Sequence, residues 1–377
     1  MVFWPSFPDG KESNRYDSHR YSILSQSFSN VKCFWKYFYQ NNIIYIKSDI
    51  AAVDLFYKRQ NCLTFGIWLC YNYGDNEKLQ IGGFMTTVKE NAYAKINLFL
   101  DVTCTRDDGF HNIKTIMHSV SLCDEITVSV SPARKKSVHM IIDGCRFLPY
   151  DNRNLANRAA MLFLEKSGKC AEVNIHLKKN IPISAGLAGG STDAAAVLRA
   201  MNKAFKKPFT LSSLAKMGAE LGSDVPYCVI GRTAFCEGRG EVISKIDTDL
   251  KLNAVIAIAD EKVSTPEAYA SLDALYSNFD GSVKSDGAKY LEKINAAIEQ
   301  GASLNGCLYN IFESAVLPNC TGAATLKTEL LELGAVGSLM SGSGPSVFGI
   351  FESKDDAENA AKKLKEKGYR AYYAHTV

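Results

Sequence analysis

The stretch Ile181-Pro-Ile-Ser-Ala-Gly-Leu-Ala-Gly-Gly-Ser-Thr-Asp-Ala-Ala-Ala196 is a glycine-rich loop that runs directly into a segment of small residues. Gly186, Gly189 and Gly190 allow left-handed torsions and close approach of main-chain N–H groups to an anion. The alanine-rich continuation to Ala204 favours a helix, and the start of a helix favours phosphate. The stretch therefore predicts a polyphosphate site, and with it an enzyme that uses a nucleotide.

This loop differs from two common nucleotide-binding loops. No Gly-Lys-Ser or Gly-Lys-Thr follows its glycines, so it is not a Walker A loop. No Gly-x-Gly-x-x-Gly follows a strand, so it is not a dinucleotide-binding turn either. The alternative to a phosphate-binding loop is an ordinary helix cap after a glycine-rich turn. Other segments of the chain are needed to distinguish these two interpretations.

The composition is that of a globular protein. The 377 residues are 46% hydrophobic and 22% charged, enough for two domains with their own cores. A net charge of +3 argues against a nucleic-acid partner. The 11 cysteines show no Cys-x-x-Cys pair, which favours reduced thiols in the cytoplasm over a zinc site or disulfides. No run reaches the ~18 apolar residues expected of a membrane span.

Residues 1–84 differ in composition from the rest of the chain. They hold all 3 tryptophans and 19 of the 40 aromatic residues, without a sustained period of 3.6 or 2. The run Ile81-Gly-Gly-Phe-Met85 can be encoded with a ribosome-binding sequence ahead of an initiator at Met85. We therefore predict that residues 1–84 are a non-native or mis-called extension, poorly ordered; a transit peptide or a small accessory domain are the alternatives. A peptide from before Met85 in mass spectra of the native protein would contradict this hypothesis.

Residues 85–245 combine strand and helix signals. From Ala94 to Val102 every second residue is apolar, which is typical of a half-buried strand, and Lys95 and Asn97 then share a polar face that suits a solvent-lined cleft. A glycine turn follows at 106–111. Further strands are expected at 125–130, 138–142 and 172–177, and helices at 154–166 and 211–221.

Residues 246–377 form the second predicted domain. Helices are expected near 266–275, 289–299, 310–316 and 323–333. A strand, turn, strand, helix, strand pattern then runs from Ser338 to Ala374, with a second glycine-rich turn at 341–346. This alternation favours an α+β sandwich with a mostly antiparallel sheet.

Three segments in this order, 92–98, 182–195 and 337–346, resemble the GHMP kinase superfamily of small-molecule kinases. Within it, segments 94–100, 108–111, 189–194, 221–226 and 235–241 together resemble the 4-diphosphocytidyl-2-C-methyl-D-erythritol kinase family. The resemblance covers residues 85–377. It implies an α+β, two-domain GHMP kinase fold, with a cleft between an N-terminal ribosomal-protein-S5-like domain (85–245) and a C-terminal ferredoxin-like α/β sandwich (246–377).

The same resemblance implies the reaction and its catalytic residues. ATP phosphorylates the 2-hydroxyl of a CDP-linked methylerythritol in the non-mevalonate route to isoprenoid precursors. Asp224 is expected to accept or orient the proton of the substrate hydroxyl, and Lys95 to keep Asp224 ionised and stabilise charge on the transferred group. The alternative for these two residues is a structural ion pair, or a helix cap for Asp224 alone.

For ATP, the resemblance assigns the loop to the phosphates, through Pro182, Ser184, Ala185, Gly186, Leu187, Ala188, Gly189, Gly190, Ser191 and Thr192. Ala185 and Ala188 replace glycines of the family pattern, which is tolerable if both keep negative φ. Ser191 and Thr192 hydroxyls are expected near the phosphates or Mg²⁺. The metal is expected because phosphoryl transfer needs charge compensation, but its protein ligands are unknown.

For the substrate, the resemblance places Phe110 and Tyr269 on either side of the cytosine ring, with His111 at its edge. Phe110 stands where the family usually has Tyr. Asn97 is expected to reach the methylerythritol or its phosphate, and Asp224 its hydroxyl. The turn 341–346 is expected to border the cleft. Ordinary core packing is the alternative for the two aromatic rings.

Two other functions stay open at this point. One is another GHMP kinase, of the homoserine or mevalonate type, against which the Asp108-Gly-Phe-His111 segment argues. The other is a non-catalytic sensor of nucleotide or sugar, which should have lost Lys95 or Asp224. The expected partners are CDP-methylerythritol and ATP, without nucleic acid or membrane, in a monomer or weak homodimer.

Overall fold

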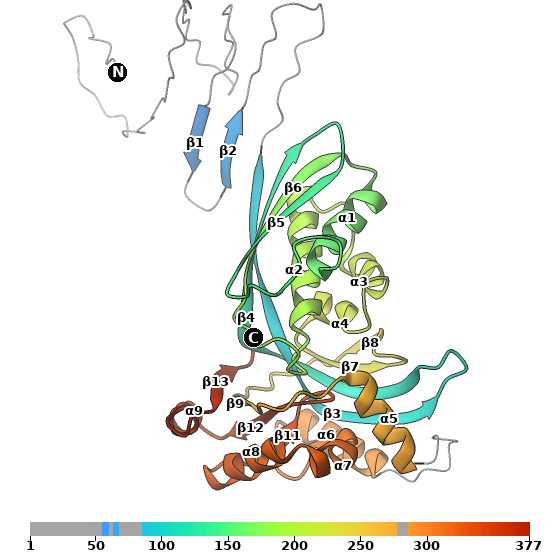
Figure 1. Cartoon of the computed structure of the whole chain (residues 1–377), viewed down its shortest axis with the longest axis vertical. Helices are drawn as coiled ribbons and strands as arrows, with labels where there is room; N and C mark the ends of the chain where they lie inside the picture. Colours follow the sequence, from blue (N-terminus) through green and yellow to red (C-terminus); the bar gives the residue numbers. More distant parts are fainter. Residues whose placement is uncertain (1–54, 60–62, 68–84, 277–285) are drawn as a thin grey trace, which may run out of the picture. The chain divides into compact units, whose positions relative to one another are not determined.

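The computed structural model describes residues 55–59, 63–67, 85–276 and 286–377 (Figure 1). The chain divides into two units, Met1–Met85 and Thr86–Val377. The described part of the first unit is an antiparallel hairpin of β1 (Leu55–Arg59) and β2 (Leu63–Ile67). The remainder of the extension expected at residues 1–84 lies outside the described residues.

The second unit begins with a long antiparallel pair, β3 (Thr86–Thr105) and β4 (His111–Pro132). The sheet built on this pair has the order β10-β3-β4-β6-β5, and β7 also pairs with β4 and carries β8. Its other strands are β5 (Ser137–Asp143), β6 (Ala171–Lys178), β7 (Thr233–Glu237), β8 (Val242–Lys245) and β10 (Tyr309–Asn310). The glycine turn expected at 106–111 connects β3 to β4, and Gly109 takes a φ of 78° there.

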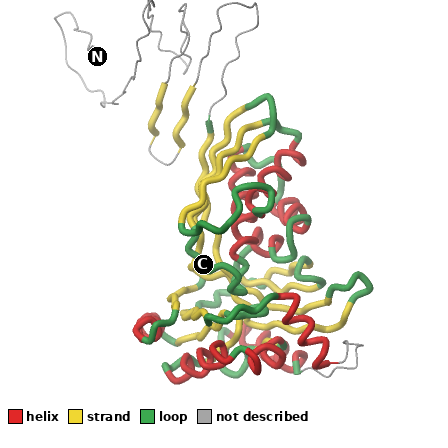
Figure 2. Tube along the Cα trace, in the orientation of Figure 1, coloured by secondary structure: helices red, strands yellow, loops and turns green. Residues whose placement is uncertain are grey.

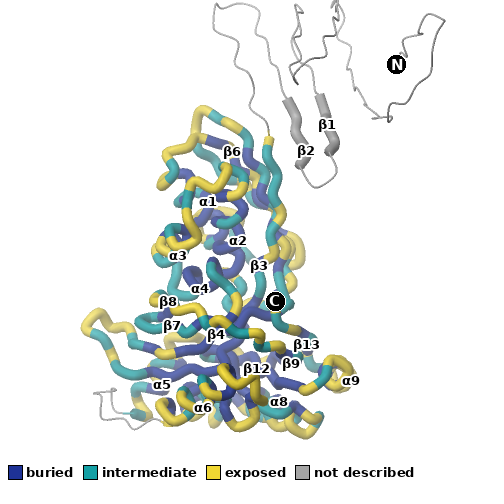
Figure 3. Tube along the Cα trace, turned by 180° about the vertical axis from the view of Figure 1, so that it is seen from behind, coloured by how far each residue is buried: buried dark blue, intermediate teal, exposed yellow. Residues whose placement is uncertain are grey.

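Helices cover one face of this sheet (Figures 1 and 2). Buried and non-buried residues alternate strictly along β6, because one face packs on helices and the other does not. The helices on this face are α1 (Leu155–Ser167), α2 (Gly189–Ala204), α3 (Leu211–Ala219) and α4 (Val225–Ile230). Figure 3 shows α2 as largely buried, in keeping with its central place among them.

The polar side of β3 differs from the expectation of an open strand face. Every residue from Ala94 to Val102 is buried, and Lys95 and Asn97 are only 5% and 3% exposed. The reason is tertiary: α2 packs on β3, and the backbone N–H of Lys95 donates to Leu187 O at 3.2 Å. Breaks in the β3–β4 register also interrupt a strict two-residue period.

The second sheet is antiparallel throughout, as predicted, with the order β11-β12-β9-β13. Its strands are β9 (Asn253–Ile258), β11 (Gly337–Met340), β12 (Ser346–Phe351) and β13 (Arg370–His375). Helices α8 (Thr321–Glu332) and α9 (Lys354–Glu366) pack on one of its faces. The remaining helices are α5 (Thr265–Tyr276), α6 (Gly287–Gln300), α7 (Phe312–Val316) and a 3-10 turn at Leu317–Asn319.

The two sheets share a hydrophobic core. Ile256 and Phe348 of the second sheet pack in one cluster with Leu98 and Ile116 of the first. Thr86–Val377 accordingly forms a single compact unit. A boundary between residues 245 and 246 therefore stays a prediction, since apolar contacts cross it.

A buried histidine ties the C-terminal end of the chain to the first sheet. His118 of β4 is 1% exposed, and its ring nitrogens lie 2.9 Å from Thr233 Oγ1 and 3.0 Å from Thr376 Oγ1. Burial lowers the pKa of His118 from 6.5 to about 4. Below pH 6.5 the imidazole of His118 is therefore protonated in the unfolded chain but stays neutral in the folded chain. The contribution of His118 to the free energy of unfolding is complete above pH 6.5 and is lost as the pH falls toward 4.

We expect the titration of His118 to lower the free energy of unfolding by roughly 2 kcal/mol when the pH falls from 7 to 5. Urea unfolding of the wild type and of His118→Gln at both pH values measures it. The variant should lose less stability than the wild type on acidification. Parallel losses in the two proteins would show that His118 is not the titrating group.

Candidate active site

The glycine-rich loop before α2 is held by the second glycine-rich turn. Ser341 Oγ donates to Gly186 O at 3.1 Å, and Ser346 Oγ donates to Ala185 O. Gly186 has a φ of +71°, and a Cβ atom there would lie 2.2 Å from Ser341 O. Only glycine fits this crossing of two backbones. The turn 341–346, expected to border the cleft, thus fixes the shape of the loop.

The start of α2 lacks a side-chain cap. The N-cap residue is Ala188, with a φ of 58°, and no side chain accepts from the first N–H groups of the helix. The condition that Ala188 keeps a negative φ is not met, since Ser184 and Ala188 both take left-handed torsions while Gly189 and Gly190 lie in the helix. Unpaired N–H groups at a helix start attract an anion.

The hydroxyl residues at the start of α2 differ in their surroundings. Thr192 is 2% exposed, and its Oγ1 donates to Gly189 O at 2.9 Å, so it is engaged within the helix. Ser191 is half-buried, and Ser184 is exposed in the loop. Of the hydroxyls expected near phosphate, Ser184 and Ser191 are the accessible ones.

Beneath the start of α2 lies a buried ion cluster that sequence reasoning missed. Lys179 Nζ pairs with Asp124 and lies 2.7 Å from Asp193 Oδ2, and the three side chains are 0% to 5% exposed. Asp124 also accepts from Ile181 N at 2.8 Å. Burial raises the pKa of Asp193 to about 8; Lys179 opposes the rise, whereas Asp124 adds to it.

Lys95 lies at one end of a buried chain of side-chain hydrogen bonds. Its Nζ donates to Asn97 Oδ1 at 2.7 Å, and Asn97 Nδ2 donates to Thr115 Oγ1 at 2.9 Å. A Cβ atom at Gly342 would be 3.4 Å from Lys95 Nζ, which places the ammonium beside the second glycine-rich turn. Asn97, expected to reach the substrate, is engaged by Lys95 and Thr115 in this structure.

Asp224 stands at the N-cap position of α4, but its side chain makes no capping hydrogen bond. Among the described residues, no ion pair within 4.0 Å joins it to Lys95. Both charges nevertheless act on one thiol: burial raises the pKa of Cys236 to about 12, with Asp224 raising it further and Lys95 lowering it. The carboxylate and the ammonium therefore share one neighbourhood without being in contact.

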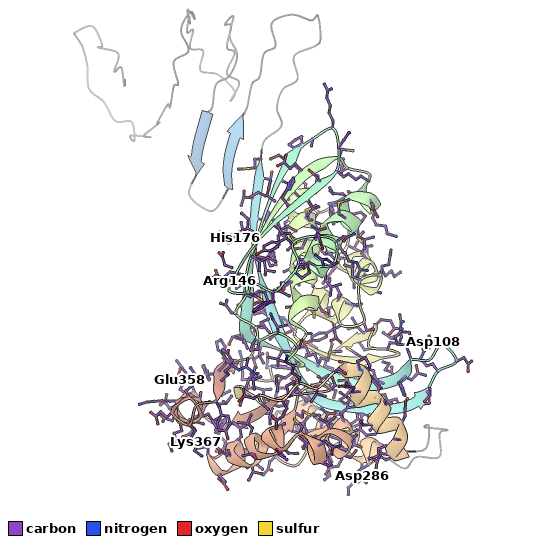
Figure 4. The ribbon with its side chains drawn as sticks, viewed as in Figure 1. Asp108, Arg146, His176, Asp286, Glu358 and Lys367 are labelled. Atoms are coloured by element: carbon purple, nitrogen blue, oxygen red, sulfur yellow. The ribbon has the colours of Figure 1, made fainter. Side chains whose placement is uncertain are left out.

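The β3–β4 turn and α5 supply the residues expected at the cytosine end. Phe110 is 52% exposed, and the guanidinium of Arg239 lies 4.9 Å from the centre of its ring. His111 stacks on Tyr269, with ring centres 4.6 Å apart at 27°. The structure thus brings His111 and Tyr269 together. Figure 4 shows Asp108 at the tip of this turn.

Three further site residues were missed by sequence reasoning. Asp273 Oδ1 lies 2.7 Å from His111 Nε2, and Arg239 covers Phe110. Asn310 Nδ2 donates to Met340 O and Gly342 O at 2.7 and 2.8 Å, which fixes the second glycine-rich turn. Arg239 belongs to segment 235–241, which resembles the family, so the sequence could have indicated it, whereas no local sequence pattern marks Asp273 or Asn310.

The described residues offer no group of three or more His, Cys, Asp and Glu side chains arranged to hold a metal ion. In the same residues, every helix is too short or too polar to span a lipid bilayer.

Two family models match separate parts of the chain. Residues 154–232 match the GHMP kinases N terminal domain, and residues 290–370 match GHMP kinases C terminal. The chain is 38% identical over 294 residues to a 4-diphosphocytidyl-2-C-methyl-D-erythritol kinase of Clostridium tetani, covering 77% of this chain and 100% of that protein. The chain belongs to the 4-diphosphocytidyl-2-C-methyl-D-erythritol kinase family. A family member from Caldicellulosiruptor saccharolyticus is 42% identical over 276 residues, covering 73% of this chain and 91% of its own.

Solved structures agree with this family and with the predicted two-domain GHMP kinase fold. A crystal structure of 4-(cytidine 5'-diphospho)-2C-methyl-D-erythritol kinase matches at 32% identity with a TM-score of 0.63, covering 76% of this chain and 98% of that one. A homoserine kinase from Cytophaga hutchinsonii matches at 19% identity with a TM-score of 0.61, covering 81% and 97%. The latter likeness concerns the fold alone.

Proposed function

We propose that this protein transfers the γ-phosphate of ATP to the 2-hydroxyl of 4-diphosphocytidyl-2-C-methyl-D-erythritol, a step of the non-mevalonate route to isoprenoid precursors. Family membership supports the activity. The uncapped start of α2 is the observation that supports this location for the reaction. The loop that precedes α2 is held in place by hydrogen bonds from Ser341 and Ser346.

ATP fits this loop by its chemistry. The first N–H groups of α2 lack a side-chain acceptor, and the helix dipole adds positive potential where phosphates bind. The loop from Pro182 to Ser191 supplies backbone donors, and the Ser184 and Ser191 hydroxyls are accessible. When bound, ATP supplies the phosphoryl group. The chain's part is to hold and orient the phosphates, since phosphoryl transfer depends mainly on positioning and charge stabilisation.

Asp224 and Lys95 act on the substrate side in this proposal. The Asp224 side chain makes no capping hydrogen bond to α4, so its carboxylate is available to accept the proton of the 2-hydroxyl. Lys95, fixed by Asn97, places a buried positive charge beside the second glycine-rich turn, where it stabilises charge on the transferred group.

The cytosine end is assigned to Phe110, His111 and Tyr269. Phe110, whose side chain is 52% exposed, offers a stacking surface. His111 occupies one face of Tyr269 in this structure, so the base can stack on Tyr269 only after His111 moves. Arg239, over Phe110, adds a positive charge that suits the diphosphate of the substrate.

Among the described residues, no group of three or more His, Cys, Asp and Glu side chains could hold a metal ion by itself. We retain Mg²⁺ in the proposal only as an ion carried by the ATP phosphates and water. No step assigned above to a residue of this chain depends on it.

The test offers ATP with CDP-methylerythritol, homoserine and mevalonate in parallel, and follows ADP release together with the ³¹P NMR spectrum of the product. We expect turnover with CDP-methylerythritol and a new phosphomonoester on its 2-position. Turnover with homoserine or mevalonate alone would refute the proposed substrate. Soluble, folded protein without turnover of any of the three would favour a sensor.

We further propose that residues 85–377 carry the whole activity in the cytoplasm, as a monomer or weak homodimer. Support comes from the matched Clostridium tetani protein, whose full length is covered by 77% of this chain, and from free thiols at the described cysteines. The same assay on a fragment that begins at Met85 should give the kcat of the full chain. A lower value would assign residues 1–84 a role in the enzyme.

A further inference from the structure

The side chain of Asn310 uses both of its donors inside the protein. It is 4% exposed, and its Nδ2 donates to Met340 O at 2.7 Å and to Gly342 O at 2.8 Å. Its Oδ1 accepts from Phe312 N at 3.0 Å. Because the nitrogen faces two acceptors and the oxygen faces a donor, the orientation of the amide is fixed.

The backbone of Asn310 belongs to the first sheet, whereas its side chain reaches the second. Asn310 ends β10, where it pairs in parallel with Leu100 of β3, and Ile311 N donates to Leu100 O at 3.0 Å. Lys95 lies on the same strand, β3. Asn310 therefore joins the strand that carries the Lys95 ammonium to the turn 341–346 beside that ammonium.

Glu313, three residues further on, completes this hold on the second sheet. Met340 ends β11, and its N–H donates to Glu313 Oε1 at 2.9 Å while its carbonyl accepts from Asn310. Lys327 pairs with the other oxygen of the Glu313 carboxylate. Since β11 lies at the edge of its sheet, the two side chains take the place of a neighbouring strand.

Gly342 lies between two groups that the proposed reaction uses. A Cβ atom at Gly342 would lie 3.4 Å from Lys95 Nζ and 3.2 Å from Gly186 O. The turn thus contacts the ammonium and also the loop before α2. A shift of Gly342 would change the separation between the ammonium and this loop.

We propose that Asn310 is a positioning residue for phosphoryl transfer, which holds the turn 341–346 so that the Lys95 ammonium and the loop before α2 keep a fixed separation. This inference rests on the proposed function and adds a residue to it. Phosphoryl transfer depends on alignment, and a misplacement of about 1 Å caused far from the reacting atoms can lower the rate roughly 100-fold.

The first test is Asn310→Asp, which keeps the size of the side chain but replaces its NH2 group with a carboxylate oxygen. The two carbonyls then lose their donors and face a negative charge, so the turn should shift. We expect kcat for CDP-methylerythritol to fall roughly 10- to 100-fold, while the KM of either substrate stays within about threefold. The matched control is Asn305→Asp, the same change at an exposed side chain before β10, which should keep the wild-type kinetics.

A double-mutant cycle with Lys95→Met separates positioning from a merely structural role. In the wild type, Lys95→Met should lower kcat by roughly 100-fold or more, because it removes the charge beside the transferred group. In Asn310→Asp the ammonium is already misplaced, so the same substitution should lower kcat by less than about 10-fold. A structural defect that does not act through Lys95 predicts instead that the two fold losses multiply.

Fold losses that multiply overturn the inference, as does an unchanged kcat in Asn310→Asp or a loss confined to KM. If Asn310→Asp does not fold, Asn310→Ser goes through the same cycle, because its smaller, uncharged side chain leaves room for a water between the two carbonyls. These outcomes leave the proposed function standing, whereas absence of CDP-methylerythritol turnover by the wild type removes the function itself.

Discussion

Replacing Asp224 with asparagine is expected to lower kcat for CDP-methylerythritol by roughly 100-fold or more, with little change in its KM. The amide cannot accept the hydroxyl proton, and it removes the negative charge next to the transferred group. The side chain makes no capping hydrogen bond to α4, so the fold should not depend on it. Steady-state kinetics and thermal unfolding of the same protein measure both effects.

The control for this substitution is Asp260→Asn, at a side chain that is fully exposed. It should reproduce the wild-type kinetics. If Asp224→Asn instead raises KM as much as it lowers kcat, or if it lowers Tm markedly, the carboxylate serves binding or folding and its catalytic assignment is wrong.

Replacing Lys179 with methionine is expected to cost roughly 3–5 kcal/mol of stability. The methionine side chain is one heavy atom shorter than that of lysine and carries no charge, so it leaves Asp124 and Asp193 buried together without a cation. Asp124 also fixes the backbone N–H of Ile181, so the loop before α2 should loosen and KM for ATP should rise. Urea unfolding and ATP titrations of the initial rate test the two parts.

The neighbouring Lys178 provides a matched control. It pairs with Glu125 at 2.8 Å, but both side chains are more than half exposed, at 54% and 55%. An exposed pair of this kind contributes about 1 kcal/mol at most, so Lys178→Met should change neither the stability nor the KM for ATP appreciably. Equal effects of the two substitutions would show that burial of the ion cluster is not what stabilises the start of α2.

Local signals in the sequence predicted much of the first sheet and its helices. Helix α1 begins after Asn154, which accepts from Ala156 N, and ends at Gly168 in a left-handed conformation. The strict alternation of β6 is equally visible in the sequence. By contrast, β9 was not predicted, because its apolar run is buried on both faces and shows no period to separate it from a helix.

The missing parts of the site depend on contacts between distant segments. Lys179 meets Asp124 across 55 residues, and His111 meets Asp273 across 162. The left-handed torsion of Ala188 was also unexpected, since an alanine favours negative φ unless its surroundings impose another conformation. Here the loop is fixed from outside by Ser341, in the turn between β11 and β12, and by Ser346, the first residue of β12.

The most direct test of the central proposal is a structure of the full chain with CDP-methylerythritol and a non-hydrolysable ATP analogue. The account predicts the 2-hydroxyl oxygen within about 2.6–3.2 Å of an Asp224 carboxylate oxygen, and the phosphates against the first N–H groups of α2. A 2-hydroxyl directed away from Asp224, or phosphates bound away from the loop that precedes α2, would contradict it.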